Sequence, residues 1–219
     1  MQIKINLKIF FFIIIFYITR QIEIYGVLML FAFLHELGHL IAGICLGFKP
    51  KTLGINPVGL SISFCIKEND YNKKIIKGNI LALKKMVIAV MGPMVNIFIV
   101  IFAILFNVEF LNISNDVIVY SNILIAFFNL LPIYPLDGGR VLKNMLHIID
   151  GLKNTYMYIN IVSNVSIIIL TIFASIMIFY LKNISVIIII SYLWYLVIKE
   201  NEKYYMKMRM YKIIESQNS

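Results

Sequence analysis

Long apolar stretches, separated by short polar segments, make up most of this chain. Two of them, Met86–Phe106 and Ile184–Val197, contain no charged residue. A helix needs about 20 mostly apolar residues to cross the hydrocarbon core of a bilayer, so these stretches predict membrane-spanning helices. Six such segments follow one another, at approximately 7–19, 24–47, 85–107, 117–133, 159–181 and 184–198. The pattern predicts an all-α polytopic membrane protein with about six transmembrane helices.

The first two apolar segments are expected to form a helical hairpin. Only a short turn around Arg20 and Glu23 separates them. Segment 7–19 is short for a span, so it either borrows flanking residues or lies tilted and partly at the interface. The sequence leaves both arrangements open.

A different pattern follows the second apolar segment. Residues 52–66 alternate apolar and small side chains around Gly54, Pro57 and Gly59. This alternation is typical of a pair of short strands or a re-entrant hairpin. The lysine-rich residues 67–85 predict a solvated or headgroup-facing connector.

Composition agrees with a lipid environment. Hydrophobic residues make up 61% of the chain and charged residues 14%, whereas about a quarter of a soluble domain is charged. An ordinary soluble fold is therefore excluded. The net charge of +9 does not indicate nucleic-acid binding, because the lysines flank the apolar segments and no nucleic-acid-binding motif occurs.

The distribution of basic residues predicts the topology. Residues 1–6, 48–84, 134–158 and the tail from 199, with the adjoining span edges, hold 18 of the 20 lysines and arginines. The loop 108–116 holds two acidic residues and no basic one. Because basic residues stay on the cytoplasmic side, both termini are expected in the cytoplasm.

The second apolar segment carries two histidines and a glutamate in the sequence HELGH. Ionisable groups inside a span cost roughly 2.5–3.5 kcal/mol for an acidic residue on insertion scales, so an accidental motif is the weaker interpretation. His35 and His39 are four residues apart, and both rings project from one helix face toward a common metal ion. Glu36 lies beside them, where its carboxylate can exchange a proton with water.

Zinc held by two histidines needs a third protein ligand, and Asp137 is the best candidate. It lies in NLLPIYPLDGGRVL, where Pro132 and Pro135 are expected to break a helix and Gly138 and Gly139 let the backbone turn. The competing interpretation is that Asp137 only caps a helix beginning near Gly139.

Polar residues in the third and fourth apolar segments are further candidates. Asn96 follows the Gly92-Pro93 pair, which is typical of close helix packing, and it is a candidate for orienting the loop around Asp137. Asn129 is a candidate for hydrogen-bonding a substrate backbone or a developing oxyanion. The residues expected to shape the site or to contact substrate are Asn96, Asn129, Pro135 and Gly138.

At HELGH, the Gly92-Pro93 pair and NLLPIYPLDGGR the sequence resembles the site-2 protease family of intramembrane zinc metalloproteases. The matching motifs lie within about residues 24–145. The resemblance implies one zinc ion per chain bound by His35, His39 and Asp137, with Glu36 as the catalytic acid and base. The expected organisation is an N-terminal span, a catalytic core, two C-terminal spans and a short basic tail, at residues 1–23, 24–145, 146–198 and 199–219.

The segments INPVGLSIS and KKMVIAVMGP are most similar to the sporulation branch of that family. This resemblance implies a membrane-associated substrate like pro-sigma-K, cleaved at the mother-cell face of the membrane around the forespore. It also implies inhibitory membrane partners resembling SpoIVFA and BofA. About 20 residues follow Ile198, so neither a CBS nor a PDZ domain is expected; these residues predict an amphipathic helix at the membrane surface. Asn160, Asn164 and Ser166 either belong to a partner-docking surface or make ordinary interhelical contacts.

Three other functions fit parts of this pattern. A metal transporter would place acidic or histidine sites along several spans, and here there is one cluster. A non-catalytic membrane binding protein would have no need of Glu36. A general small site-2 protease acting on another membrane-tethered regulator is the main alternative to the sporulation role.

Overall fold

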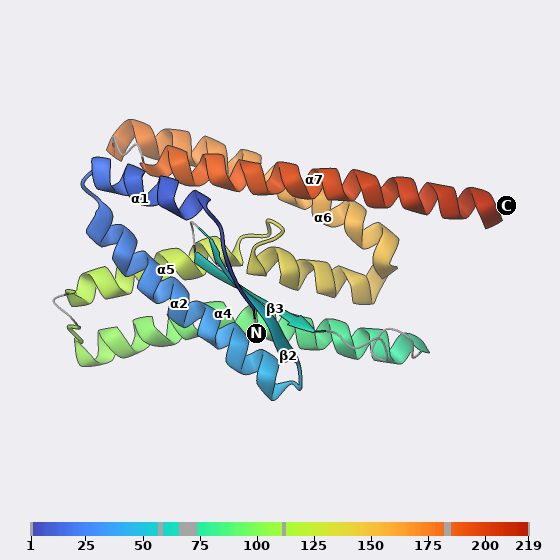
Figure 1. Cartoon of the computed structure of the whole chain (residues 1–219), viewed down its shortest axis with the longest axis horizontal. Helices are drawn as coiled ribbons and strands as arrows, with labels where there is room; N and C mark the ends of the chain where they lie inside the picture. Colours follow the sequence, from blue (N-terminus) through green and yellow to red (C-terminus); the bar gives the residue numbers. More distant parts are fainter. Residues whose placement is uncertain (1, 57–58, 66–73, 111–112, 182–184, 219) are drawn as a thin grey trace. The chain divides into compact units, whose positions relative to one another are not determined.

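The computed structural model describes residues 2–56, 59–65, 74–110, 113–181 and 185–218 of the chain. It divides into two compact units, Met1–Leu130 and Leu131–Ser219, which are described in turn. The elements follow the chain (Figure 1) in the order β1 (Gln2–Ile5), α1 (Lys8–Ile18), α2 (Ile22–Cys45), β2 (Lys49–Asn56), β3 (Gly59–Cys65), α4 (Lys74–Phe106), α5 (Asn115–Leu130), α6 (Asp137–Leu181) and α7 (Ser185–Asn218).

The six predicted apolar segments all lie largely in helices. Among the described residues, three helical stretches are long and apolar enough to cross a membrane: Ile22–Cys45, Ile80–Phe106 and Asn154–Ile178. Ile9–Ile18 and Asn115–Leu130 are apolar but shorter. The mainly helical fold is confirmed, and the number of six spans stays a prediction.

In the first unit, α1 and α2 form the expected hairpin. Three residues separate the two helices, and Arg20 in the middle adopts a positive φ of 57°. Phe16 of α1 stacks on Tyr25 of α2 with the ring centroids 4.8 Å apart. The turn therefore reverses the chain within three residues and brings two aromatic rings into contact.

The region after α2 forms a β-hairpin, as its alternation predicts. β2 and β3 are antiparallel, and β1 adds to the other edge of β2 in parallel register, with Ile3 opposite Leu53. Nothing in the sequence pattern predicted β1, because four residues are too few for an alternation to be recognised. Phe64 of β3 packs directly against Gly43, so the sheet contacts the C-terminal part of α2.

The predicted connector 67–85 is only partly correct. From Lys74 onward the chain is already helical and forms the start of α4. A lysine-rich sequence is a good helix former, and the apolar segment that follows extends the same helix without a break. The first part of the predicted connector, residues 67–73, lies outside the described residues.

α2, α4 and α5 pack around a buried cluster of Phe31, Ala103 and Ile118. α2 and α4 approach each other closely at Gly38. A Cβ placed there would lie 2.8 Å from the carbonyl oxygen of Met91 and 2.7 Å from Cγ2 of Val95. Small residues allow membrane helices to approach in this way, because there is little hydrophobic driving force between helices in lipid. Gly38 therefore brings the helix with both histidines against the backbone of α4.

The second unit begins with the broken segment that the prolines predict. α5 ends at Leu130 and α6 begins at Asp137, two residues before the predicted start near Gly139. A Cβ on Gly139 would lie 2.6 Å from the carbonyl oxygen of Ile133, so the first turn of α6 packs against the preceding loop. Within α6, Gly151 has a positive φ of 75° and divides the helix into two parts.

α6 and α7 are joined by polar contacts. Asn160 donates to Asn201 across 2.6 Å, and Asn201 donates to Asn164 across 2.9 Å. Trp194 donates its indole N–H to Thr171 at 2.9 Å. Asn160 and Asn164, two of the three residues considered for partner docking, thus make the interhelical contacts that the alternative interpretation predicts. α7 also continues through the predicted tail, so the last apolar segment and residues 199–218 form a single helix.

We expect Gly38→Ala to lower the free energy of unfolding by about 1–3 kcal/mol, because the new methyl group forces α2 away from α4. Gly26→Ala is the matched control on the same helix: no atom lies within 4 Å of its Cβ position, and alanine favours helix. Denaturant unfolding of the purified protein in detergent micelles, followed by circular dichroism, compares the two. Equal stability of both variants would contradict this close approach.

Candidate metal centre

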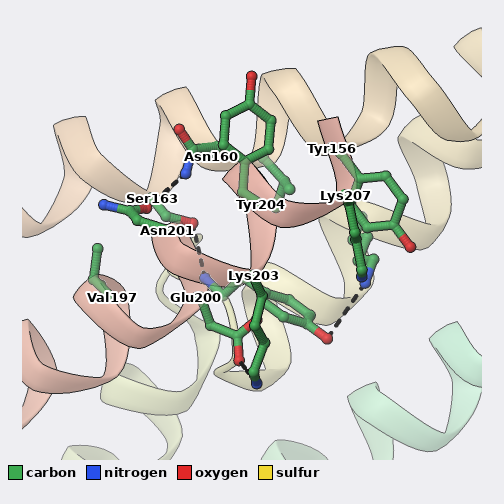
Figure 2. A pocket seen from close by; sticks show the side chains of 12 residues that line it. Tyr156, Asn160, Ser163, Val197, Glu200, Asn201, Lys203, Tyr204 and Lys207 are labelled. Carbon is green, nitrogen blue, oxygen red and sulfur yellow. Dashed lines mark hydrogen bonds and ion pairs between the residues drawn. The ribbon is translucent and has the colours of Figure 1, made fainter. Parts of the chain in front are cut away.

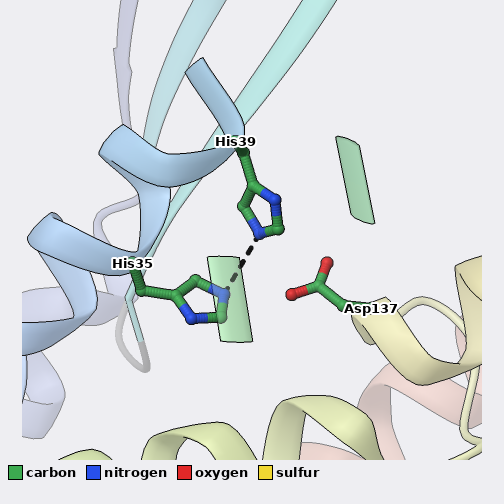
Figure 3. Close-up of side chains that lie close together, drawn as sticks. All are labelled: His35, His39 and Asp137. Carbon is green, nitrogen blue, oxygen red and sulfur yellow. Dashed lines mark hydrogen bonds between the residues drawn. The ribbon is translucent and has the colours of Figure 1, made fainter. Parts of the chain in front are cut away.

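Two buried imidazoles on α2 form the core of the candidate site. His35 and His39 are each only 3% exposed, and Figure 3 shows both rings projecting from the same side of the helix. Their Nε2 atoms are 3.1 Å apart. The four-residue spacing thus places both rings together, as predicted from the sequence.

A chain of hydrogen bonds determines where the proton of His35 lies. The Asn122 side chain donates to the carbonyl oxygen of Ile118 at 2.8 Å, and a carbonyl can only accept. Its amide oxygen accordingly accepts from Asn96 at 2.8 Å, which turns the oxygen of Asn96 toward Nδ1 of His35 at 2.6 Å. Nδ1 of His35 therefore carries a proton, and Nε2 presents a lone pair.

His39 is held in the same way by α4. Its Nδ1 lies 2.6 Å from the backbone carbonyl oxygen of Ile88, so this nitrogen also donates. In the neutral form of the two rings both Nε2 atoms are then acceptors, and they lie 3.1 Å apart. Two lone pairs at this separation repel unless a cation lies against them, and neutral imidazoles with donating Nδ1 atoms are the usual form of histidine metal ligands. The donor set therefore fits a metal ion.

Gly92 of α4 leaves the space that the rings need. A Cβ at this position would overlap the ring of His39 and lie 2.6 Å from Nε2 of His35. Only glycine allows α4 to pass so near the Nε2 atoms of the two histidines. Gly92 thus makes room for both imidazole rings.

Glu36 follows His35 and is half-buried. Consecutive helical residues leave the axis about 100° apart, so its carboxylate flanks the face of the two histidines. This position suits a group that exchanges protons beside the two imidazoles.

Asp137 belongs to the second unit and is 4% exposed. It is the first residue of α6, and Figure 3 shows its carboxylate projecting from the start of that helix. Arg140 lies one turn later, with Nη1 3.3 Å from Oδ1 of Asp137. Pro135 lies two residues before the aspartate and Gly138 directly after it, and both are half-buried.

The two asparagine candidates have different contacts. Asn129 donates to the carbonyl oxygen of Ile125 within α5, at 3.0 Å. Asn96 was expected to orient the loop around Asp137; its observed partners are His35 and Asn122, both in the first unit. Asn122 was not identified from the sequence, although a fully buried asparagine in an apolar segment is the kind of costly polar group that marks a site.

Comparisons with known proteins found a partial family match, one curated relative and a solved structure of similar fold. Residues 109–173 match the model of peptidase family M50. A zinc metalloprotease of Methanocaldococcus jannaschii is 29% identical over 145 residues, which cover 63% of this chain and 38% of that protein. The chain thus spans less than half the length of this curated relative. The solved site-2 protease from Methanocaldococcus jannaschii has the same fold, with a TM-score of 0.61 and 21% identity over 90% of this chain and 89% of the other.

We expect Asn96→Ala to weaken zinc binding about 10- to 100-fold, because His35 loses the acceptor that fixes its proton on Nδ1. Asn164→Ala is the control: it removes a partly buried polar contact between α6 and α7 and none of the given contacts of either histidine. Competition with a chelator of known affinity, in detergent, gives both constants. An Asn96→Ala protein that binds zinc as tightly as the Asn164→Ala protein would contradict the role of Asn96.

Proposed function

We propose that this protein is an intramembrane zinc metalloendopeptidase of the site-2 protease family, within peptidase family M50. The observation that carries the proposal is the pair of buried imidazoles, each with its Nδ1 donating and its Nε2 directed at the other. The match of residues 109–173 to the family and the shared fold of the solved site-2 protease support it. The three long apolar helices agree with an integral membrane protein.

His35, His39 and Asp137 are the proposed ligands of one zinc ion. Two neutral imidazoles and one carboxylate form a ligand set typical of catalytic zinc, which leaves a coordination position for water or substrate. The ion pair with Arg140 then orients the carboxylate of Asp137, which can still bind the metal ion through its other oxygen. When bound, zinc supplies Lewis acidity to the scissile carbonyl group and to water.

Glu36 is the proposed general base and acid. Its carboxylate takes a proton from the attacking water and returns it to the amine that leaves when the peptide bond breaks. Asn129 keeps a second amide hydrogen beyond the one donated to Ile125. This hydrogen is available for a substrate carbonyl or for the oxyanion that develops on it.

An extended substrate segment is proposed to add to β3. In the described sheet, β1 and β3 flank β2, so one edge of β3 faces no other strand. A helical substrate hides its carbonyl groups in its own hydrogen bonds, and it must unwind before hydrolysis. Pairing with a strand edge holds the unwound backbone through main-chain hydrogen bonds.

A membrane-associated regulator like pro-sigma-K is the proposed substrate, which rests on the similarity to stage IV sporulation protein FB. The same proposal includes inhibitory membrane partners resembling SpoIVFA and BofA. We also propose six spans with both termini in the cytoplasm, which the basic residues of the inner segments support. The proposed location is the membrane around the forespore. The main alternative is a small site-2 protease acting on another membrane-tethered regulator.

Two substitutions separate metal binding from proton transfer. Glu36→Gln should keep about one zinc per chain and slow cleavage at least about 100-fold, since an amide cannot accept the proton. Asp137→Ala should lose both zinc and activity. Glu109→Gln and Asp116→Ala alter exposed carboxylates and are the matched controls. Zinc is measured by elemental analysis and cleavage by immunoblotting of a co-expressed substrate.

Cleavage by Glu36→Gln within about threefold of the wild type would exclude Glu36 as the base. Undiminished zinc in Asp137→Ala would mean that the third ligand lies elsewhere. Both outcomes are distinct from a folding defect, which circular dichroism of the same samples reports.

Substrate identity is tested by co-expression. We expect cleavage of a pro-sigma-K-like protein by the wild type and not by Glu36→Gln, and reduced cleavage when partners resembling SpoIVFA and BofA are present. Cleavage of other tethered regulators in place of the pro-sigma-K-like protein would favour the alternative. Cleavage unchanged by every partner would contradict control by membrane proteins.

A further inference from the structure

A basic, aromatic pocket lies within the second unit, between α6 and α7. Its cavity volume is about 30 Å³, which leaves room for one small group. Figure 2 shows the side chains that line it, contributed by both helices. Three lysines and one glutamate are among them, so the lining carries an excess of two positive charges: Lys143, Lys203, Lys207 and Glu200.

The lysines fall into two kinds. Lys203 forms an ion pair with Glu200 on the same helix. Lys143 and Lys207 instead lie against aromatic rings: their Nζ atoms are 5.0 Å and 4.1 Å from the ring centre of Tyr156. Lys143 also lies 4.3 Å from the ring centre of Tyr134 and donates to its hydroxyl group at 3.3 Å.

Two ammonium groups on one tyrosine ring repel each other, and the ring faces offset this repulsion only in part. An anion between them removes it. Lysine ammonium and tyrosine hydroxyl groups are hydrogen-bond donors suited to a phosphate group. The carboxylate of Glu200 is paired with Lys203, so Lys143 and Lys207 are the two lysines that we assign to the ligand.

The pocket lies where the helices change from apolar to charged. Tyr156 and Ser163 belong to the first part of the apolar stretch Asn154–Ile178. On α7, Val197 ends the apolar half, and Lys203 and Lys207 follow in the basic half. Lysine and tyrosine at such a boundary are typical of the headgroup level of a bilayer.

We propose that this pocket binds a phosphate group, supplied by the headgroup of an anionic phospholipid. The phosphate lies between Lys143 and Lys207, and the buried side chains of Ile159 and Val197 form the apolar part of the lining. Lys143 lies in the first part of α6, the part that begins at Asp137. A headgroup bound here therefore links the first part of α6, before Gly151, to α7.

The test uses the full chain in nanodiscs and in detergent. Native mass spectrometry compares retention of phosphatidylglycerol and phosphatidylcholine by the wild type, by Lys143→Gln/Lys207→Gln, and by Lys199→Gln/Lys212→Gln. The last pair removes the same charge from exposed lysines of α7 outside the pocket. We expect each of the two lysines beside the phosphate to strengthen binding by a factor of about five, so the pocket variant should retain about 25-fold less phosphatidylglycerol. The control should stay within about threefold of the wild type.

Three results would overturn the proposal. An equal loss in both double variants would indicate a general basic surface. Equal retention of the two lipids by the wild type would exclude an anionic headgroup. Displacement of phosphatidylglycerol by inorganic phosphate at equal concentration would show a soluble phosphate compound as the source. A melting temperature measured for each variant separates loss of binding from loss of folding.

Discussion

An imidazole in a hydrocarbon environment has no water with which to exchange hydrogen bonds, so its orientation depends on whatever fixed acceptor the protein provides. Here α4 provides both acceptors, Asn96 for His35 and the carbonyl oxygen of Ile88 for His39. The direction of the first hydrogen-bond chain is set by the carbonyl group of Ile118, which cannot donate. Through Asn122 and Asn96 this single constraint decides which nitrogen of His35 is available to a metal ion.

The close approach of α2 and α4 follows from the same requirement. Acceptors on α4 can reach the imidazoles only if the two helices nearly touch, and Gly38 and Gly92 remove the side chains that would keep them apart. Gly43 has the same role toward Phe64 of the sheet. Glycines in the first unit therefore lie on α2 or against it, because both helix packing and the orientation of the histidines require close contact there.

In the second unit, polar groups serve to fix one helix against another. Asn160, Asn164 and Asn201 satisfy one another between α6 and α7, which matters because an unpaired amide in lipid is costly. Further along α7, towards its C-terminus, the pairing changes to lysines on aromatic rings. The unit thus passes from contacts that suit hydrocarbon to contacts that suit the headgroup region, in agreement with the proposed phosphate site.

The sequence by itself determined those features that depend on neighbouring residues. Apolar runs predicted the helices, alternation predicted the hairpin of β2 and β3, and the prolines before Asp137 predicted the break between α5 and α6. The four-residue spacing was enough to place His35 and His39 on one face. Tertiary structure alone decided the pairing of β1 with β2, the partner of Asn96 and the role of Asn122. The side-chain contacts join residues 26 and 61 positions apart, and the paired residues of β1 and β2 are 50 positions apart. A local sequence pattern does not indicate which distant group a side chain will contact.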